Sequence, residues 1–238
     1  PATAARIASL SRDVMIEGAP LSDWWQKQEQ DTQFRFAQQV RQGVVNGETQ
    51  AAIVARITGR PGVPGVLDIT RRNARTLVHS AVMSAANNAR METFRKNSDV
   101  IKGVRWSAAL DSHTCLRCGV LDQKGWTLEG QPIAPNTVTF QMPPAHVNCR
   151  CQMTGITKTF RELGLNIDEP AVSTRASSEG QIAADTSFSA FLARQSPEFI
   201  DGVLGKTRAE MFRSGQLTLR DFVSGGGRVI NLDQLRAS

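Results

Sequence analysis

The chain has 238 residues, 40% of them hydrophobic, which is enough for a core of one or two domains. Its 21% charged residues are ordinary for a globular protein, and no apolar run approaches the roughly 18 residues of a membrane-spanning helix. We therefore expect a protein without a membrane anchor that is assembled in the cytoplasm, and the lack of a leader supports this expectation. The formal net charge of +6 is moderate, so its distribution matters more than its size.

The N-terminal part of the chain predicts three helices. Residues 1–20 predict a short helix, residues 22–43 a longer one, and residues 48–58 a third. Trp24 and Trp25 stand at the start of the second helix and cannot both face one core. We expect one of them to anchor a partner, since Trp is enriched at binding hot spots. The alternative is that both pack beneath the following turn.

A cluster of Gly and Pro at 59–65 predicts a boundary, after which Thr70 caps the longest periodic segment, a helix that ends near 97. His79 lies beside its apolar face and is expected to pack there, not to bind a metal. Residues 70–110 contain eight basic and two acidic residues, and their net charge of +6 equals that of the whole chain. Such a segment suits a phosphate backbone, and the alternative is a solvated helix face. The basic residues are Arg71, Arg72, Arg75, Arg90, Arg95, Lys96, Lys102 and Arg105.

All four cysteines lie within 37 positions, in the segments Cys115-Leu116-Arg117-Cys118 and His146-Val147-Asn148-Cys149-Arg150-Cys151. Thiolate and imidazole ligands at this spacing are typical of one tetrahedral zinc ion. Five residues compete for its four positions, and these candidates are Cys115, Cys118, His146, Cys149 and Cys151. Because successive side chains of a strand alternate between faces, we expect Cys149 and Cys151 both to bind only if the backbone turns between them.

Two other uses of the cysteines stay open. An even number of cysteines also fits a disulfide framework, although a chain of this length forms a core without one. A redox Cys-x-x-Cys pair is a further alternative, but such pairs stand at the start of a helix that follows a strand. Here 104–110 predicts a strand, and the residues after Cys118 predict a strand and a turn, with a hairpin over 120–128. A structural zinc knuckle on that hairpin is therefore our preferred interpretation.

The rest of the chain predicts a proline-rich loop over 130–145, a closing strand over 151–156 and, after a polar stretch, short helices. Ser196-Pro197 is a helix start of the cap-then-proline type. The predicted fold class is α+β and mostly helical, with a small hairpin core that resembles a zinc knuckle, long flanking helices and a helical C-terminal segment. The predicted regions are an N-terminal helical region (1–65), a core with the Cys/His cluster (66–160), a linker or arm (161–187) and a C-terminal helical segment (188–238).

Two runs of sequence resemble the phage Mu F-like minor head protein family, the phage head-morphogenesis domain. The first is Trp106 with Asp111-Ser112-His113-Thr114-Cys115-Leu116-Arg117-Cys118-Gly119-Val120-Leu121-Asp122, and the second is Pro143-Pro144-Ala145-His146-Val147-Asn148-Cys149-Arg150-Cys151. The resemblance covers roughly residues 70–160. The family usually places Gly after its Leu-Asp, whereas Gln123 stands there in this chain and the next glycine is Gly125, so we expect a remodelled turn.

The resemblance implies a minor capsid protein of a tailed phage that lies in the capsid interior near the portal, in several copies per virion. It implies the portal and major capsid proteins as partners, a role in head assembly and genome packaging or delivery, and no established catalytic activity. Double-stranded DNA is a further expected partner because of the basic residues.

Two enzyme classes are the alternatives. A zinc deaminase needs His-x-Glu, and Glu follows none of the three histidines at that position, so this class is excluded. A zinc-clamped His-Asn-His type nuclease acting on phage DNA would use His113, Asn148 and a further histidine. If His146 binds zinc, too few histidines remain for that site.

Overall fold

The computed structural model describes residues 15–16, 19–20, 30–66, 71–170, 173–225 and 227–236. The chain divides into two compact units, Pro1–Lys96 with Gln141–Gln152, and Asn97–Phe140 with Met153–Ser238. Within the described ranges no helix is both long and apolar enough to span a membrane. Trp24 and Trp25 lie outside the described residues, so the predicted partner anchor stays a prediction.

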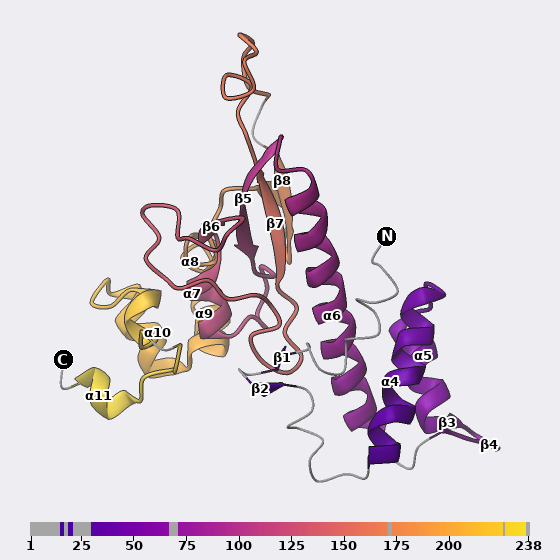
Figure 1. The fold of residues 1–238 in the computed structure, drawn as a ribbon. Helices are drawn as coiled ribbons and strands as arrows, with labels where there is room; N and C mark the ends of the chain where they lie inside the picture. Colours follow the sequence, from indigo (N-terminus) through magenta and orange to yellow (C-terminus); the bar gives the residue numbers. More distant parts are fainter. Residues whose placement is uncertain are drawn as a thin grey trace. The chain divides into compact units, whose positions relative to one another are not determined.

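The first unit is built on the three helices α4 (Gln30–Val45), α5 (Gln50–Thr58) and α6 (Arg71–Lys96) (Figure 1). Their apolar faces form one core, in which Phe36, Ile57 and Val78 are at most 2% exposed. Thr49 caps α5, because its side chain accepts a hydrogen bond from the Ala52 backbone N–H at 3.2 Å. The helices predicted over 48–58 and from 70 to about 97 are therefore confirmed, while the predicted cap residue Thr70 lies outside the described residues.

The first unit also contains two short hairpins. Strand β3 (Gly59–Arg60) pairs with β4 (Val63–Pro64), where the Gly and Pro cluster predicted a boundary. Strand β1 (Met15–Ile16) pairs with β2 (Ala19–Pro20), so the prediction of a helix up to residue 20 is wrong at its end. Gly18 and Pro20 favour a turn, and this local preference outweighs the sparse apolar spacing around them.

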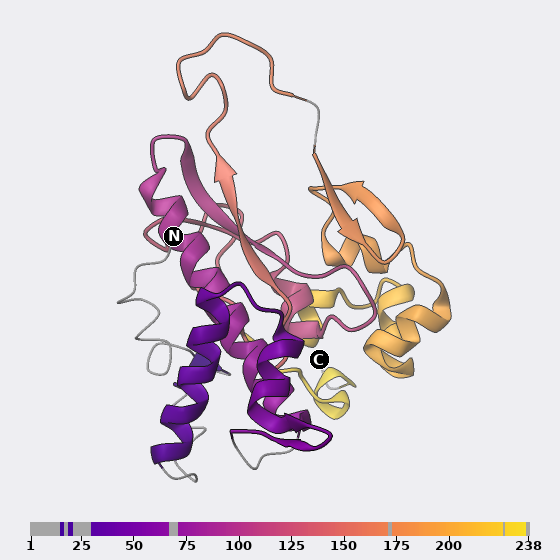
Figure 2. The same cartoon turned by 90° about the vertical axis from the view of Figure 1, so that its right-hand side faces the viewer.

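The second unit contains a three-stranded sheet of order β6-β5-β7, whose strands are labelled in Figure 1 and turned by 90° in Figure 2. Strand β5 (Ile101–Ser107) pairs antiparallel with β6 (Gly125–Thr127), placing Val104 opposite Trp126, and β7 (Gln152–Thr157) is the other edge. The strands predicted over 104–110 and 151–156 are confirmed with shifted ends. The hairpin predicted over 120–128 is wrong, because its first half is helical and β6 pairs with β5.

The loop over 130–140 is held by β6. The Trp126 indole N–H donates to the Val138 carbonyl at 2.7 Å, and the ring contacts Phe140 edge-on at 5.8 Å between centroids. The Asn136 side chain donates to the Gly125 carbonyl at 2.8 Å. The predicted loop is therefore present, and these contacts explain how a long segment without regular structure is tolerated.

The C-terminal part of the second unit forms a hairpin and a small helical cluster. The predicted linker contains strands β8 (Thr174–Ser177) and β9 (Gly180–Ala183), which pair with each other. The helices are α8 (Phe188–Leu192), α9 (Pro197–Leu204), α10 (Lys206–Arg213), the 3-10 turn η1 (Leu219–Phe222) and α11 (Leu232–Arg236). Ser196 caps α9 as predicted, and its side chain accepts from the Phe199 N–H at 3.3 Å.

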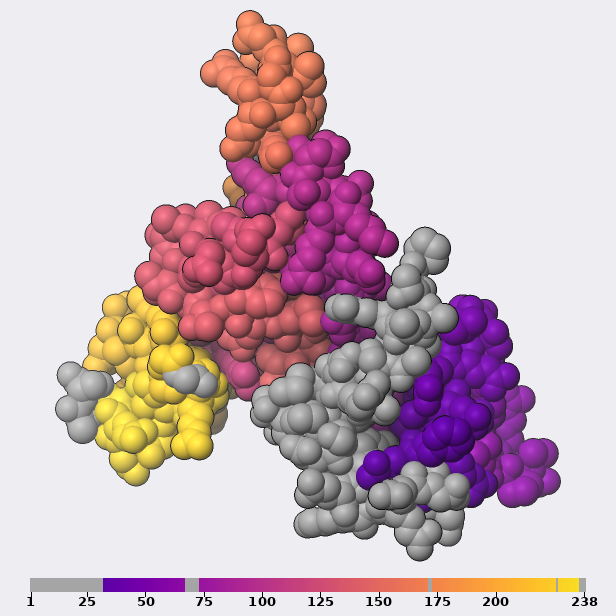
Figure 3. Space-filling view, in the orientation of Figure 1, coloured from indigo at the N-terminus to yellow at the C-terminus, as the bar shows by residue number. Residues whose placement is uncertain are grey.

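Between β7 and β8, residues 158–170 project from the strands (Figure 1, Figure 3). All residues from 161 to 170 are exposed, including the apolar Leu163, Leu165 and Ile167. With helices in both units and only short strands among the described residues, the predicted α+β, mostly helical class is confirmed.

Candidate metal centre

The first cysteine pair stands at the start of a short helix. Helix α7 spans Leu116–Leu121, and Cys115 is its N-cap residue, whose carbonyl accepts from the Gly119 N–H at 2.9 Å. Cys118 follows one turn later, and the two Sγ atoms lie within 4.8 Å of each other. Cys118 is buried and Cys115 is exposed. One helical turn therefore holds two thiols in a position to share one ion.

This helix contradicts the strand and turn that the sequence predicted after Cys118. Leu116, Val120 and Leu121 are buried at helical spacing, and this packing outweighs the low helix propensity of Gly119. The argument against a redox Cys-x-x-Cys pair rested on the predicted strand, so that argument is wrong. The redox alternative must instead be tested by experiment.

The second ligand segment begins with a tight turn. The Cys149 N–H donates to the His146 carbonyl at 3.2 Å, and Asn148 between them has φ 59°, a left-handed conformation that Asn tolerates well. The His146 Nδ1 atom lies 2.8 Å from the Val147 carbonyl oxygen. A proton on Nδ1 would satisfy this contact and leave the Nε2 lone pair directed away from it, as in a metal-binding histidine.

Cys149 and Cys151 follow this turn and lie on one side of the backbone. Both are buried, Arg150 between them is exposed, and the two Sγ atoms lie within 4.8 Å of each other. The expectation that a turn between them would be needed is wrong. Side chains at i and i+2 of an extended backbone face the same side, so both thiols can serve one ion without such a turn.

Helix α6 holds this segment in place through three polar side chains. His79 Nε2 lies 3.0 Å from the Cys149 carbonyl, Ser80 Oγ accepts from the Asn148 N–H at 3.4 Å, and buried Asn87 donates to the Cys151 carbonyl at 3.3 Å. His79 thus packs beside the site and is in neither of the two candidate ligand groups of the described residues. Sequence reasoning missed Ser80 and Asn87, whose signal was small polar side chains on the otherwise apolar face of the predicted helix.

Two groups of residues could hold a metal ion in the described part of the chain. One is Cys115 with Cys118 and His146, and the other is Cys118 with Cys149 and Cys151. Two thiolates on a tetrahedral zinc ion lie about 3.8 Å apart, since each Zn–S bond is about 2.3 Å, so the spacing within each cysteine pair is compatible with zinc. No disulfide joins any of the four cysteines, which argues against the disulfide framework. The donor set is soft and suits zinc better than calcium or magnesium.

The predicted basic residues of α6 differ in their exposure. Arg75, Arg95 and Lys96 are exposed, and Lys96 Nζ lies 3.9 Å from a Glu92 carboxylate oxygen. Arg90 is half-buried. The side chains of Arg71 and Arg72 lie outside the described residues.

The two basic residues of β5 both contact other parts of the chain. Lys102 pairs with Glu162 at 2.7 Å, and this pairing helps to lower the pKa of the Glu162 carboxyl to about 2. Arg105 donates to Gln123 Oε1 at 3.0 Å. Several of the eight cations therefore have protein partners, and nucleic-acid binding stays a prediction.

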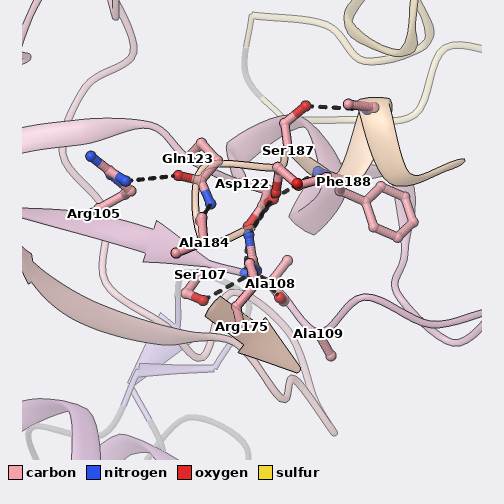
Figure 4. Close-up of polar contacts among 12 residues, drawn as sticks. Arg105, Ser107, Ala108, Ala109, Asp122, Gln123, Arg175, Ala184, Ser187 and Phe188 are labelled. Atoms are coloured by element: carbon pink, nitrogen blue, oxygen red, sulfur yellow. Dashed lines mark hydrogen bonds and ion pairs between the residues drawn. The ribbon is translucent and has the colours of Figure 1, made fainter. Parts of the chain in front are cut away.

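A buried ion pair lies at the C-terminal end of α7 (Figure 4). The Arg175 guanidinium, from β8, makes two parallel hydrogen bonds to the Asp122 carboxylate at 3.0 and 3.1 Å. The same carboxylate accepts from the backbone N–H groups of Ala108 and Phe188, both at 2.7 Å. Burial raises the pKa of Asp122, and Arg175 and the two N–H donors oppose that shift.

Gly119 of α7 is required for close packing against the C-terminal helices. A Cβ at this position would overlap the Phe188 ring and lie 3.3 Å from Leu219 Cδ2, and both side chains are buried. We expect Gly119→Ala to lower the free energy of unfolding by about 1–3 kcal/mol, the usual cost of overpacking a core. Urea denaturation measures this change.

Gly202→Ala is the matched control for that measurement. Gly202 lies in helix α9 and has no atom within 4 Å of an added Cβ, so alanine there should be neutral or should stabilise by up to about 1 kcal/mol. Equal effects of the two substitutions would show that Gly119 has no special packing role.

The middle part of the chain shows the family to which it belongs. Residues 35–154 match the family model described as Phage Mu protein F like protein, which is half of the chain. The chain belongs to this family. No curated protein and no solved structure matches it. The match confirms the resemblance in the sequence and begins within α4, well before the predicted start near residue 70.

Both Cys/His segments lie inside the part that matches the Phage Mu F like family, and β8 to α11 lie outside it. The position at which the family usually has glycine is Gln123, whose φ is 65°. Glycine adopts such a left-handed conformation without steric cost, which explains why the family usually has glycine at this position. The turn therefore keeps a glycine-like backbone, so the expectation of a remodelled turn is wrong. The Gln123 side chain donates to the Ala184 carbonyl at 3.1 Å, which helps to hold this conformation. Membership of this family points to a phage head protein.

Proposed function

We propose that this chain is a minor capsid protein of a tailed phage that acts in head morphogenesis without catalysing a reaction. The family match over residues 35–154 supports this proposal most directly. In this proposal the protein lies in the virion, in the capsid interior near the portal, after assembly in the host cytoplasm. Its partners are the portal protein and the major capsid protein, and its role is in head assembly and in packaging or delivery of the genome.

We further propose that zinc stabilises the matched region. Cys115 and Cys118 would supply two ligands, and two of His146, Cys149 and Cys151 would supply the others. When bound, the ion would act as a structural cross-link between two segments that are separated by the 27 residues 119–145. The polar contacts from α6 to the second segment would orient those ligands in advance.

The proposed role is tested by quantitative mass spectrometry of purified heads of the phage that encodes this chain. We expect the chain to be present in a low, fixed ratio to the portal protein and to co-purify with the portal from cells that lack the major capsid protein. Complete absence from mature heads and from assembly intermediates would contradict a minor capsid role.

The absence of catalysis is a separate part of the proposal. A nuclease that uses magnesium or manganese needs oxygen ligands, whereas the two candidate metal groups among the described residues contain only Cys and His. His113 and Asn148, which the nuclease alternative would use, are both exposed. Incubation of plasmid DNA with the chain and magnesium or manganese should give no nicking. Nicking that His113→Ala abolishes would establish the nuclease instead.

We propose double-stranded DNA as a further partner. Three cations of α6, Arg75, Arg95 and Lys96, are exposed and so can reach a phosphate backbone. Filter binding at increasing salt should then show affinity that falls steeply as salt rises. Binding that is absent, or that does not respond to salt, would remove DNA from the list of partners.

A further inference from the structure

Helix α7 belongs to two structural features at once. Its N-cap Cys115 and its Cys118 are candidate metal ligands. Leu116 and Val120 of the same helix belong to the apolar core that is otherwise formed mainly by C-terminal residues. In that core Phe188, Phe191 and Phe222 are at most 2% exposed. A change in the position or order of α7 therefore affects both the thiols and this core.

The end of α7 adds a polar link between the same two features. The Asp122 N–H donates to the Cys118 carbonyl at 3.1 Å, so Asp122 closes the turn that carries this cysteine. The Asp122 carboxylate accepts from the Phe188 N–H at the start of α8, and it binds Arg175 of β8 (Figure 4). Arg175 also donates to the Ala108 carbonyl at 2.5 Å, the Thr186 carbonyl at 3.1 Å and Ser107 Oγ at 3.2 Å. Asp122 thus joins Cys118, through its backbone N–H, to both β8 and α8, through its carboxylate.

The length of α7 makes this arrangement consequential. The helix has six residues, and a helix of this length is unstable by itself because nucleation is unfavourable and few hydrogen bonds repay it. Its order must come from the contacts at its two ends and along its buried face. Two sets of contacts that stabilise the same marginal element are thermodynamically linked, and each strengthens the other by the same factor.

We propose that metal binding at Cys115 and Cys118 and docking of the C-terminal segment (residues 173–225 and 227–236) are coupled through α7. With the metal bound, α7 is ordered and the C-terminal segment is packed on it. When the metal leaves, the segment is released and its apolar side chains, led by Phe188 and Phe191, become accessible. The inference rests on the proposed metal site, but not on the proposed role in the phage head.

Hydrogen–deuterium exchange of the full chain tests the proposal. After zinc is removed with a chelator, the amides of α8, such as Phe191, which donates to the Ser187 carbonyl at 2.8 Å, should exchange at least about 10-fold faster. The amides of α5 in the first unit should change by less than about 2-fold, and added zinc should restore the slow exchange of α8. Unchanged exchange in α8, or an equal increase in α5 and α8, would overturn the coupling.

Linkage gives a second measurement in the opposite direction. Arg175→Met should weaken zinc affinity by about 10-fold, measured by competition with a chromogenic chelator, although Arg175 is not a metal ligand. Arg213→Met is the matched control, because Arg213 pairs with Asp201 at 2.5 Å on the exposed surface of the same segment. If Arg175→Met does not fold, Ser107→Ala removes only one acceptor of the guanidinium and should give a smaller shift in the same direction.

These measurements distinguish failure of the coupling from failure of the zinc site. Stoichiometric zinc with equal affinity in the wild type and in Arg175→Met overturns the coupling and leaves the zinc site intact. A chain that binds no zinc overturns both. Neither result bears on whether the protein is found in phage heads, which mass spectrometry decides.

Discussion

Cys118→Ser is expected to abolish zinc binding and to cause a large loss of stability. Cys118 belongs to both candidate ligand groups and is buried, so no other candidate can replace it without rearrangement. Metal affinity is coupled to folding, and we expect the substitution to lower the free energy of unfolding by more than about 3 kcal/mol. For a chain of this size this corresponds to a fall in Tm of roughly 10 °C. Elemental analysis and calorimetry measure the two effects.

The controls for this prediction use the wild type. A chelator should lower the wild-type Tm to nearly that of Cys118→Ser, and zinc should restore the wild type but not the variant. If the Cys118→Ser variant still binds one zinc ion per chain and has an unchanged Tm, the proposed metal centre is contradicted. A wild-type Tm that responds to a reductant and not to a chelator would instead identify a disulfide or a redox pair.

Arg175→Met is expected to cause the second large effect. Removal of the guanidinium leaves the Asp122 carboxylate without its counter-ion, and the Asp122 side chain is 0% exposed. Such a loss typically lowers the free energy of unfolding by about 3–5 kcal/mol. Urea denaturation measures the change. Arg213→Met removes a cation from an exposed pair and should cost less than about 1 kcal/mol. A similar small cost for both substitutions would show that the buried pair does not secure the C-terminal segment.

The same variant should have a characteristic dependence on pH. Burial already raises the pKa of Asp122, and loss of Arg175 removes the main group that opposes this shift, so the pKa should rise further. A carboxyl whose pKa is higher in the folded state than in the unfolded state stabilises the fold at low pH, and this stabilisation is lost as pH rises through the folded pKa. The stability deficit of Arg175→Met relative to wild type should therefore shrink as pH falls below neutral.

The parts of the fold with strong local signals were predictable from the sequence. The apolar spacing along α6, the cap of α9 at Ser196-Pro197 and the soft-ligand pattern all have local causes. Helix α7 was not predictable, because it is short, contains a glycine and depends on burial against residues some 70 positions later in the chain. The hairpin of β8 and β9 was read as a linker for a similar reason. Its residues are small and polar, and its position depends on Arg175 reaching Asp122, 53 residues away.

The candidate site shows the same division. Its five possible ligands could be identified from residue types and spacing alone. The supporting contacts from Ser80 and Asn87 could not, because they join residues 64 or more positions apart. The alternation of side chains along 149–151 places both thiols on one side of the backbone, so this feature of the site could be predicted from the sequence.

The projecting segment after β7 has a consequence for the covalent continuity of the chain. Residues 161–170 are all exposed, so a protease has access to this stretch without disturbing either packed side of it. A single cut there would sever the chain between β7 and β8. The packing of Leu116 and Val120 in the apolar core with the C-terminal helices is non-covalent and would persist. The ion pair between Arg175 and Asp122 would persist for the same reason. The two fragments would therefore stay together as one particle in gel filtration and separate only in denaturant.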